Sequence, residues 1–369
     1  MSDCLQTVIG MLAISKMIPV YRPSTVNRAC CTTNVDYLVN DWCRNFIHSW
    51  AIRITPNQFV SSGLSTDTLE RIHRAQFCLV LAYLQGCGSV AVDPPAGAYL
   101  SNDMAVVTAT PAPGWSFLQW LGDATGTNPV VSVSMSRNRC VQAVFGTGLS
   151  NTVVGGGSVA RSPAMPLYPY GTTVRLGAVP AGENYFALWA NAASGTNNPL
   201  HFTITNANPT VTAVFAALQV NQQKALTVLV NGGGAVLRSP MANRFNTGAQ
   251  VFLTAMPDAG QSFISWSGDF NGLQNPLLVV MLSNKVITAN FTKRPRLEVF
   301  NCGGPLDSLD VPLQLRGEPG LAHHLGVSTN LVHWSALATV TNVFGTVQWN
   351  DTNGGPHRFY QAVEPPPPQ

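Results

Sequence analysis

The sequence predicts an all-β protein in which three small tandem modules are followed by a fourth β module of another kind. Three observations support this fold class. Seven landmark residues recur at one spacing in three copies, which indicates a tandem repeat. Only 10% of the residues are charged, against about 25% in an average soluble domain. Short apolar runs alternate with turn-forming Gly, Pro and Asn, a composition typical of strands and turns.

Each copy runs from a glycine to a tryptophan through the order Gly, Pro, aromatic, Ala, Pro, Phe, Trp. The three copies begin at Gly88, Gly157 and Gly234. Each continues through an Asn-Pro pair to a closing Ala-x-Phe, with a slip of one residue at a point where a turn would tolerate it. The Asn-Pro pairs begin at Asn128, Asn198 and Asn275, and the closing pairs are Ala143/Phe145, Ala213/Phe215 and Ala289/Phe291.

The third copy shows the expected strands most clearly. Residues 225–230 alternate and then meet three glycines, which permit a tight turn into a return strand at 235–238. Further strands are expected at 250–255, 261–266, 277–282 and 286–291. Short strands without a helical period predict an all-β or nearly all-β module.

Residues 1–76 differ from the rest and form a segment of uncertain order. A helical pattern runs from Ser65 to Leu84, so a short, partly helical N-terminal segment is expected. The first residues make a poor signal peptide, because Lys16 interrupts the apolar run and no basic residue precedes it. A small helical domain and a misplaced start of the chain both remain open.

Large aromatic side chains are expected to form each module's core, because so small a domain depends on a few big side chains. The predicted core residues are Trp120, Trp189, Trp266, Phe117, Phe186, Phe263, Phe145, Phe215 and Phe291. The alternative is that the tryptophans are exposed platforms that stack on sugars. Aromatics that do not recur in all copies are the candidates for ligand stacking, namely Trp115, Tyr170 and Tyr185.

The pattern G-x-V…P…Y…G…V-x-L-x-A-x-P…F…W-x-G-D…N-P…V-x-A-x-F resembles the divergent InlB B-repeat, or bacterial repeat domain. The resemblance implies β-grasp-like or similar β-rich modules, found in tandem in exported and surface-attached bacterial proteins as a spacer or adhesive stalk without catalysis. The second copy departs from the pattern by having Asn191-Ala192 in place of Gly-Asp. In the first copy, residues 83–87 stand in place of the usual strand and glycine turn.

The predicted boundaries are 77–147 for module 1, 150–217 for module 2, 224–292 for module 3 and 297–365 for a C-terminal module. The last resembles a short β module at the C-termini of large secreted bacterial proteins. Its marks are S-x-x-L-x-x-W from Ser328 to Trp334 and F-Y-x-x from Phe359.

No catalytic, cofactor-binding or metal site is predicted. General acid and base catalysis needs two titratable groups close together, and module 2 has one carboxylate, Glu183. Asp269 and Asn271 faintly resemble a calcium loop that lacks its glutamate. His323 and His324 are expected on opposite faces of a strand. A net charge of +3 without a basic run argues against nucleic acid, and no apolar run is long enough for a transmembrane segment.

The sequence therefore predicts a non-enzymatic, exported or cell-surface repeat protein that acts as an adhesive stalk, spacer or interaction array. Its expected location is extracellular or at the cell surface, and its expected partner is an extracellular polymer or a surface protein. The alternative is an accessory carbohydrate-binding region of a secreted hydrolase. A third hypothesis, an enzyme within residues 1–76, would need a pocket that so short a segment rarely provides.

Overall fold

The chain is all-β in its computed structural model, which describes residues 77–78, 80–95, 99–100, 102–219, 221–300, 311–353 and 357–363. The described residues contain strands and no helix, so the predicted fold class is confirmed. The segment 1–76 lies outside them. The helical pattern predicted up to Leu84 is wrong over its last part, because β2 (Val80–Gln85) pairs in parallel with β8 (Arg139–Thr147).

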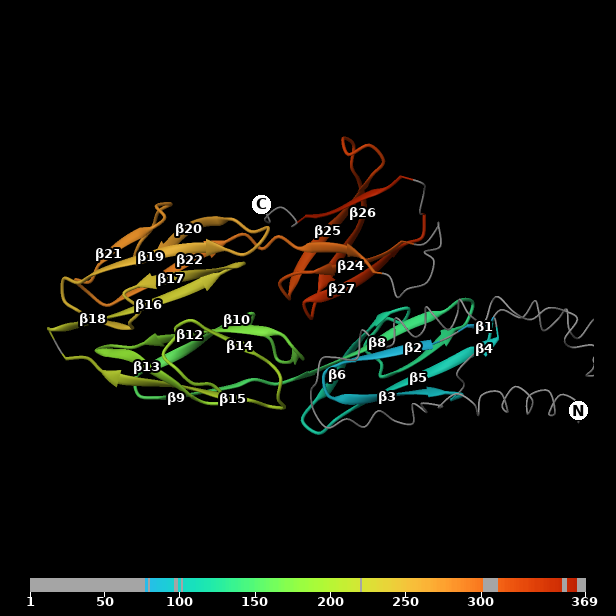
Figure 1. Ribbon diagram of the computed structural model, residues 1–369, viewed down its shortest axis with the longest axis horizontal. Helices are drawn as coiled ribbons and strands as arrows, with labels where there is room; N and C mark the ends of the chain where they lie inside the picture. The colour runs from blue at the N-terminus through green and yellow to red at the C-terminus, as the bar shows by residue number, and fades with distance from the viewer. Residues whose placement is uncertain are drawn as a thin grey trace, which may run out of the picture.

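Each repeat folds as a small sandwich of two three-stranded sheets with one further short strand (Figure 1). Module 1 contains β2, β3 (Gly88–Asp93), β4 (Tyr99–Leu100), β5 (Met104–Pro111), β6 (Ser116–Gly122), β7 (Val130–Ser134) and β8; β1 (Phe77–Cys78) pairs with β4. Module 2 contains β9 (Ser150–Val154), β10 (Gly157–Ser162), β11 (Tyr168–Pro169), β12 (Thr173–Pro180), β13 (Asn184–Asn191), β14 (Leu200–Thr203) and β15 (Thr210–Ala217). Module 3 contains β16 (Gln223–Asn231), β17 (Gly234–Ser239), β18 (Arg244–Asn246), β19 (Gln250–Pro257), β20 (Phe263–Gly268), β21 (Leu277–Val280) and β22 (Lys285–Phe291).

The two sheets have the same topology in every module. In the first sheet the opening strand pairs in parallel with the closing strand, which also pairs antiparallel with the strand that carries the tryptophan. The second sheet is antiparallel, in the orders β3-β5-β7, β10-β12-β14 and β17-β19-β21. Apolar residues of both sheets meet between them, so each module is a β-sandwich whose core lies between two facing sheets.

The first copy contains the opening strand and the glycine turn, although its residues 83–87 depart from the repeat pattern. β2 is that strand, and Gly86 then takes a φ of 106°. Gly155 and Gly232 have positive φ at the same place in the other modules. Glycine adopts this left-handed conformation without steric cost, so the chain can turn sharply from one sheet into the other.

The C-terminal module is a separate small sandwich. It contains β23 (Arg296–Val299), β24 (Val311–Arg316), β25 (Leu321–Ser328), β26 (Ser335–Asn342), β27 (Thr346–Asp351) and β28 (Phe359–Val363), in the sheet orders β23-β24-β27 and β26-β25-β28. The stretch from Ser328 is a turn, because the Ser328 hydroxyl accepts from the amides of Asn330 and Leu331. β25, which contains His323 and His324, is the central strand of its sheet.

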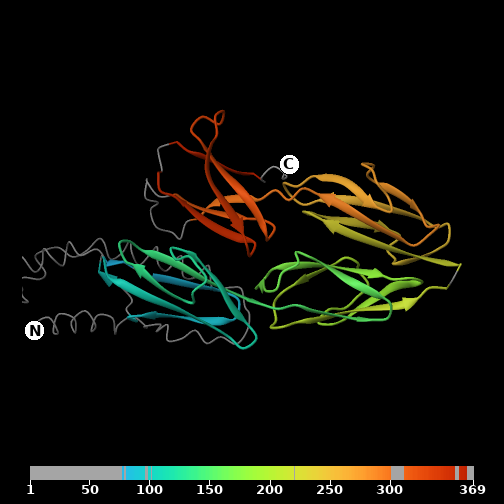
Figure 2. The same cartoon turned by 180° about the vertical axis from the view of Figure 1, so that it is seen from behind.

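The modules form two side-by-side pairs rather than a line (Figures 1 and 2). Module 2 follows module 1 end to end, and their core residues form one continuous cluster. Module 3 then folds back beside module 2, and the C-terminal module lies beside module 1. Hydrogen bonds join both pairs, including Arg238 Nη2 to the Asn198 carbonyl (2.9 Å) and Gln119 Nε2 to the Thr346 carbonyl (3.1 Å).

Module cores and junctions as candidate functional surfaces

The recurring aromatics lie in the module cores. Trp120, Trp189 and Trp266 are between 1 and 2% exposed. In module 3 the Phe263 ring lies 5.3 Å from Trp266 and 5.7 Å from Phe291, centroid to centroid. The corresponding distances are 5.1 and 6.0 Å in module 1 and 4.8 and 6.0 Å in module 2. Tilted and edge-on contacts of this kind suit the aromatic quadrupole. The tryptophans thus have no ring face open for stacking on sugar.

Each buried indole also has a polar partner. Its Nε1 donates to the carbonyl eight residues later, at 2.8 Å to Asn128, 2.7 Å to Asn197 and 2.8 Å to Gln274. In modules 2 and 3 the next residue is the landmark asparagine, and its side-chain amide pairs with the backbone of Ala178 or Ala255. In module 1 the loop is one residue shorter, so Asn128 itself supplies the acceptor. The slip of one residue in the repeat is absorbed here.

A β-bulge explains why the phenylalanine and tryptophan landmarks are three residues apart. Residues three apart on a regular strand point to opposite faces. In module 3, Phe263 pairs with Phe291 and Trp266 pairs with Ala289, and the register shifts between them because Ile264 is an extra residue. The same shift occurs in the other two modules. The bulge turns both rings toward the core, and the closing Ala-x-Phe provides their cross-strand partners.

The landmark glycine is required by the closing phenylalanine. A Cβ on Gly234 would lie 2.6 Å from the Phe291 ring, and Gly157 is placed in the same way at 2.5 Å from Phe215. Gly88 repeats the arrangement at 2.6 Å from Phe145. These distances are far shorter than a normal carbon contact of about 3.5–4.0 Å. The glycine lies near the start of each repeat and the phenylalanine at its end. They recur together because they pack against each other as one unit.

The Gly-Asp turns after the tryptophan stabilise strand ends. The Asp269 carboxylate accepts from the Val286 amide at 2.7 Å, and Asp123 accepts from the Cys140 amide at the same distance. Asp123 also forms ion pairs with Arg137 and Arg139. In module 2, Asn191 replaces the glycine and takes a φ of 66°, which Asn tolerates better than most residues. The missing Asp therefore leaves the turn intact.

The three aromatics predicted as candidates for ligand stacking lie at junctions between modules. Trp115 is buried, and its ring lies 5.9 Å from that of Tyr170 across the junction of modules 1 and 2. Tyr185 lies beneath the guanidinium of Arg244 from module 3, 4.6 Å from its ring centroid. A stacking platform needs an open ring face, which Trp115 does not have. These aromatics fail to recur because each joins one particular pair of modules.

Module 3 covers the outer face of the second sheet of module 2. Leu229 of β16 lies directly over Gly177 of β12, where a Cβ would approach its side chain to 2.4 Å. Arg175 donates to the Gly232 carbonyl at 2.6 Å. Residues 225–230 were predicted to alternate, but Thr227 on the outward side is also buried, at 1% exposed. An apolar run buried on both faces is the signal that this junction leaves in the sequence.

Arg238 is the main polar residue of the same junction. Its guanidinium donates to Asn243 Oδ1 within module 3 (3.1 Å) and to the Asn198 carbonyl of module 2 (2.9 Å). Burial lowers its pKa from the ordinary value to about 10. Nearby, burial and then the charge of Arg175 lower the pKa of His201, against an opposing effect of Asp258. Arg161 takes the place of Arg238 in module 2, but module 1 has Val92 there, so this arginine recurs in two copies only and is not one of the landmarks.

The C-terminal module packs on the outer side of the first sheet of module 1. Phe344 joins a small apolar cluster with Leu118, Leu121 and Val144. The Gly122 amide also donates to the side-chain oxygen of Gln348. The cluster buries module 1 side chains that face away from their own core.

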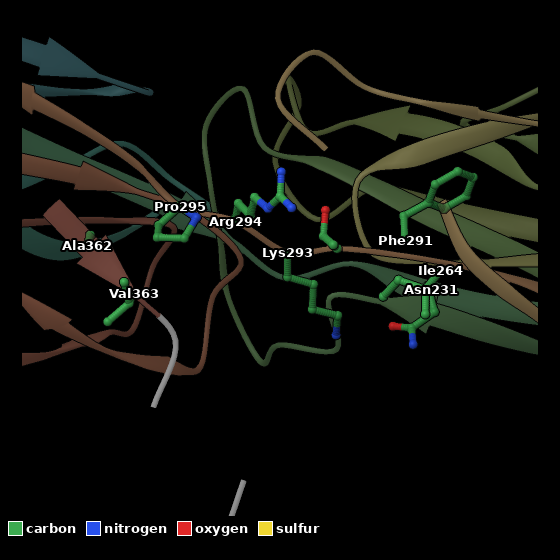
Figure 3. A pocket seen from close by; sticks show the side chains of 9 residues that line it. Asn231, Ile264, Phe291, Lys293, Arg294, Pro295, Ala362 and Val363 are labelled. Atoms are coloured by element: carbon green, nitrogen blue, oxygen red, sulfur yellow. The ribbon is translucent and has the colours of Figure 1, made fainter. Parts of the chain in front are cut away.

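A hollow of about 590 Å³ lies where module 3 leads into the C-terminal module (Figure 3). Lys293 and Arg294 line it, but Lys293 is paired with Glu318 at 3.0 Å and Arg294 donates to the Gly260 carbonyl. Apolar side chains such as Ile264 form most of the rest of its wall, together with Asn231 and Thr292, which donate to the side chains of Asn290 and Gln261. With both cations engaged, the hollow has no convergent polar set for a ligand.

The described part of the chain contains no group of three or more His, Cys, Asp or Glu residues that could hold a metal ion. His323 is fully buried, whereas His324 contacts Thr339, so the two point to opposite faces of β25 as expected. Cys140 is buried in β8 and is disulfide-bonded. Among the described residues, no helix is long and apolar enough to cross a membrane.

Comparison with known families agrees with this architecture. The model of the divergent InlB B-repeat domain matches residues 82–149, 147–219 and 225–295. This repeat family is typical of bacterial surface proteins. No curated protein matches the chain. Because the three matches together span more than half of the sequence, the chain belongs to the divergent InlB B-repeat domain family and carries three of its repeats in tandem.

Proposed function

We propose that this protein is an exported, non-enzymatic repeat protein that acts as an interaction array at the bacterial cell surface. One observation carries the proposal: the recurring residues pack inside the modules or shape their turns. The Trp-Phe-Phe clusters, the glycine under the closing phenylalanine and the asparagine pairing are all structural. What the chain repeats is a scaffold, and repeated scaffolds with variable surfaces suit binding.

The positions of the carboxylates support a role without catalysis. Asp123 is held by two arginines, and Asp269 binds a backbone amide at a strand end. Asp258 is largely exposed and faces Arg175. General acid and base catalysis requires titratable groups within reach of one reacting atom, and these carboxylates serve separate structural roles in separate places.

Two features support export. The chain belongs to a family typical of bacterial surface proteins. Cys140 is disulfide-bonded, and disulfides persist in oxidising compartments outside the cytosol. An extracellular polymer or another surface protein is therefore the partner class that we propose.

The arrangement of the modules favours an interaction array over a spacer. A stalk gains reach by placing its modules in a line, whereas here module 3 lies beside module 2 and the C-terminal module beside module 1 (Figure 2). Doubling back shortens the reach and presents a broader surface. The alternative, a carbohydrate-binding region of a hydrolase, has less support, because its stacking candidates are used in junctions.

Protease treatment of intact source cells, followed by mass spectrometry, tests export. Peptides from exposed segments such as that around Met241 should be released before any cytoplasmic marker appears. Peptides that appear only after lysis would contradict export. Deleting residues 77–363 should then reduce attachment of cells to surfaces or to one another, and unchanged attachment would contradict the interaction role.

A further inference from the structure

The outer face of the second sheet of module 3 carries an apolar patch that nothing in the described part of the chain covers. It consists of five side chains that are between 39 and 55% exposed: Leu237, Phe252, Met256, Leu278 and Val280. We call this patch the module-3 face. Phe252 on the central strand β19 lies directly across from Leu278, and Leu237 lies across from Thr254. The patch is therefore continuous across three strands rather than a scatter of single residues.

The same face is covered by another repeat in module 2. Counting from the shared Ala178 and Ala255, Gly177 corresponds to Thr254. Gly177 lies beneath Leu229 of module 3, so one repeat buries the second sheet of its neighbour. The chain thus already uses this sheet as a docking surface between repeats, and module 3 presents the next such surface.

The chemistry of the module-3 face indicates what covers it. Its outward positions contain no charged residue; besides the five apolar side chains they are Ala235, Ser239, Gln250 and Thr254. An uncharged apolar face meets an identical face without electrostatic repulsion. Protein interfaces have an apolar centre depleted in charge, and contiguous exposed apolar patches of a few hundred Å² on soluble proteins mark interaction sites.

We propose that the occupant is a second copy of this chain, which docks through the same face to form a closed dimer. Two antiparallel sheets pack face to face at about 10 Å, with Phe252 and Thr254 of each copy near the centre. The outer side of β16, which covers this kind of face within the chain, is already taken by module 2 in every copy. A face that meets its own equivalent gives a two-fold dimer rather than an open filament.

Sedimentation velocity of the purified full chain, from about 1 to 100 µM, tests this dimer. The wild type should pass from monomer to dimer across that range. Thr254→Arg places a charge at the centre of each face and should weaken dimerisation at least tenfold. The matched control is Thr108→Arg, the equivalent position on module 1, which should dimerise like the wild type. Phe252→Lys provides a second variant, and near-UV circular dichroism checks that each remains folded.

Three results would overturn the proposal. They are a wild type that stays monomeric at the highest concentration, a folded Thr254→Arg variant that still dimerises, and a ladder of larger oligomers in place of a dimer. The inference deepens the proposed interaction function by naming a partner, but its test uses purified protein alone. Failure of export or of cell attachment would therefore leave the dimer standing, and the absence of a dimer would leave export standing.

Discussion

Replacing Gly234 by alanine should selectively unfold module 3. The added Cβ would lie 2.6 to 2.7 Å from three atoms of the Phe291 ring, about 1 Å inside a normal carbon contact. The ring cannot swing away, because Phe263 lies against it and Trp266 against Phe263. Backbone and ring must both shift, as they do when an extra methyl group is forced into a packed core.

The magnitude follows from that overlap. Overpacking a core by one methyl group costs about 1–3 kcal/mol, and the rigid neighbours place this site near the upper half, at about 2 kcal/mol. For a module of this size each kcal/mol lowers the melting temperature by roughly 4–8 °C. We expect the transition of module 3 to fall by roughly 8–16 °C. The cores of modules 1 and 2 form a separate cluster, so the melting temperatures of these two modules should not change.

Differential scanning calorimetry and hydrogen exchange of β22 measure this effect. Gly148→Ala is the matched control, because its Cβ would meet Asn208 at an ordinary 3.6 Å. A double-mutant cycle with Phe291→Leu gives the decisive comparison: the smaller side chain makes room, so the two substitutions together should cost less than their sum. A Gly234→Ala variant that melts like the wild type, or costs that simply add, would refute the glycine–phenylalanine packing unit.

Four further outcomes follow from the cores and junctions. Trp266→Phe should cost about 2–3 kcal/mol through a cavity and a lost hydrogen bond, measured by denaturant titration. Arg238→Met should separate the calorimetric transitions of modules 2 and 3, because its carbonyl acceptor in module 2 loses its donor. The folded-state pKa of His201 is lowered, so the unfolded chain binds its proton more tightly; stability should fall as the pH drops through and below about 6.5, and less so in His201→Gln. Phe344→Ala should release the C-terminal module, seen as a larger radius in small-angle scattering.

The interior of each module could be predicted from the sequence because its constraints are local and repeated. Trp266, Phe263 and Phe291 pack against one another within one module. Every module needs the same core packing, so the same residue types recur at the same spacing in all three copies. The bulge could not be foreseen. A strand with period two places Phe263 and Trp266 on opposite faces, and only the extra residue Ile264 turns them together.

The start of module 1 was harder to predict for a different reason. The predicted helical pattern ends at Leu84, yet its last residues, 80–84, pair in parallel with β8, whose residues come more than fifty positions later. Pairing at that sequence distance overrides a weak local preference. The glycine turn at Gly86 was missed because Cys87 stands in place of the middle one of the three glycines that mark this turn in the other copies.

The junctions between modules were beyond prediction because they occur once each. Trp115 and Tyr185 do not recur, and an aromatic that the core does not require suggested a ligand platform. In the structure each contacts a neighbouring module instead. Residues that vary between copies therefore make the contacts of one particular module with its neighbours. A repeat pattern cannot predict these contacts, because they are not repeated.

The same reasoning connects the junctions to the module-3 face. In this tandem array, recurring residues form the core and turns of each module, whereas variable residues make the contacts between modules. A variable apolar residue at an outward position therefore implies a neighbouring surface. Phe252 occupies the position of Val106 in module 1 and Arg175 in module 2, where Arg175 contacts module 3. In module 3 this position carries the large apolar side chain of Phe252, and it remains 49% exposed. An exposed phenylalanine on a central strand keeps its apolar surface in contact with water, which is unfavourable unless another surface covers it, so the neighbour that it implies must come from outside the described part of this chain.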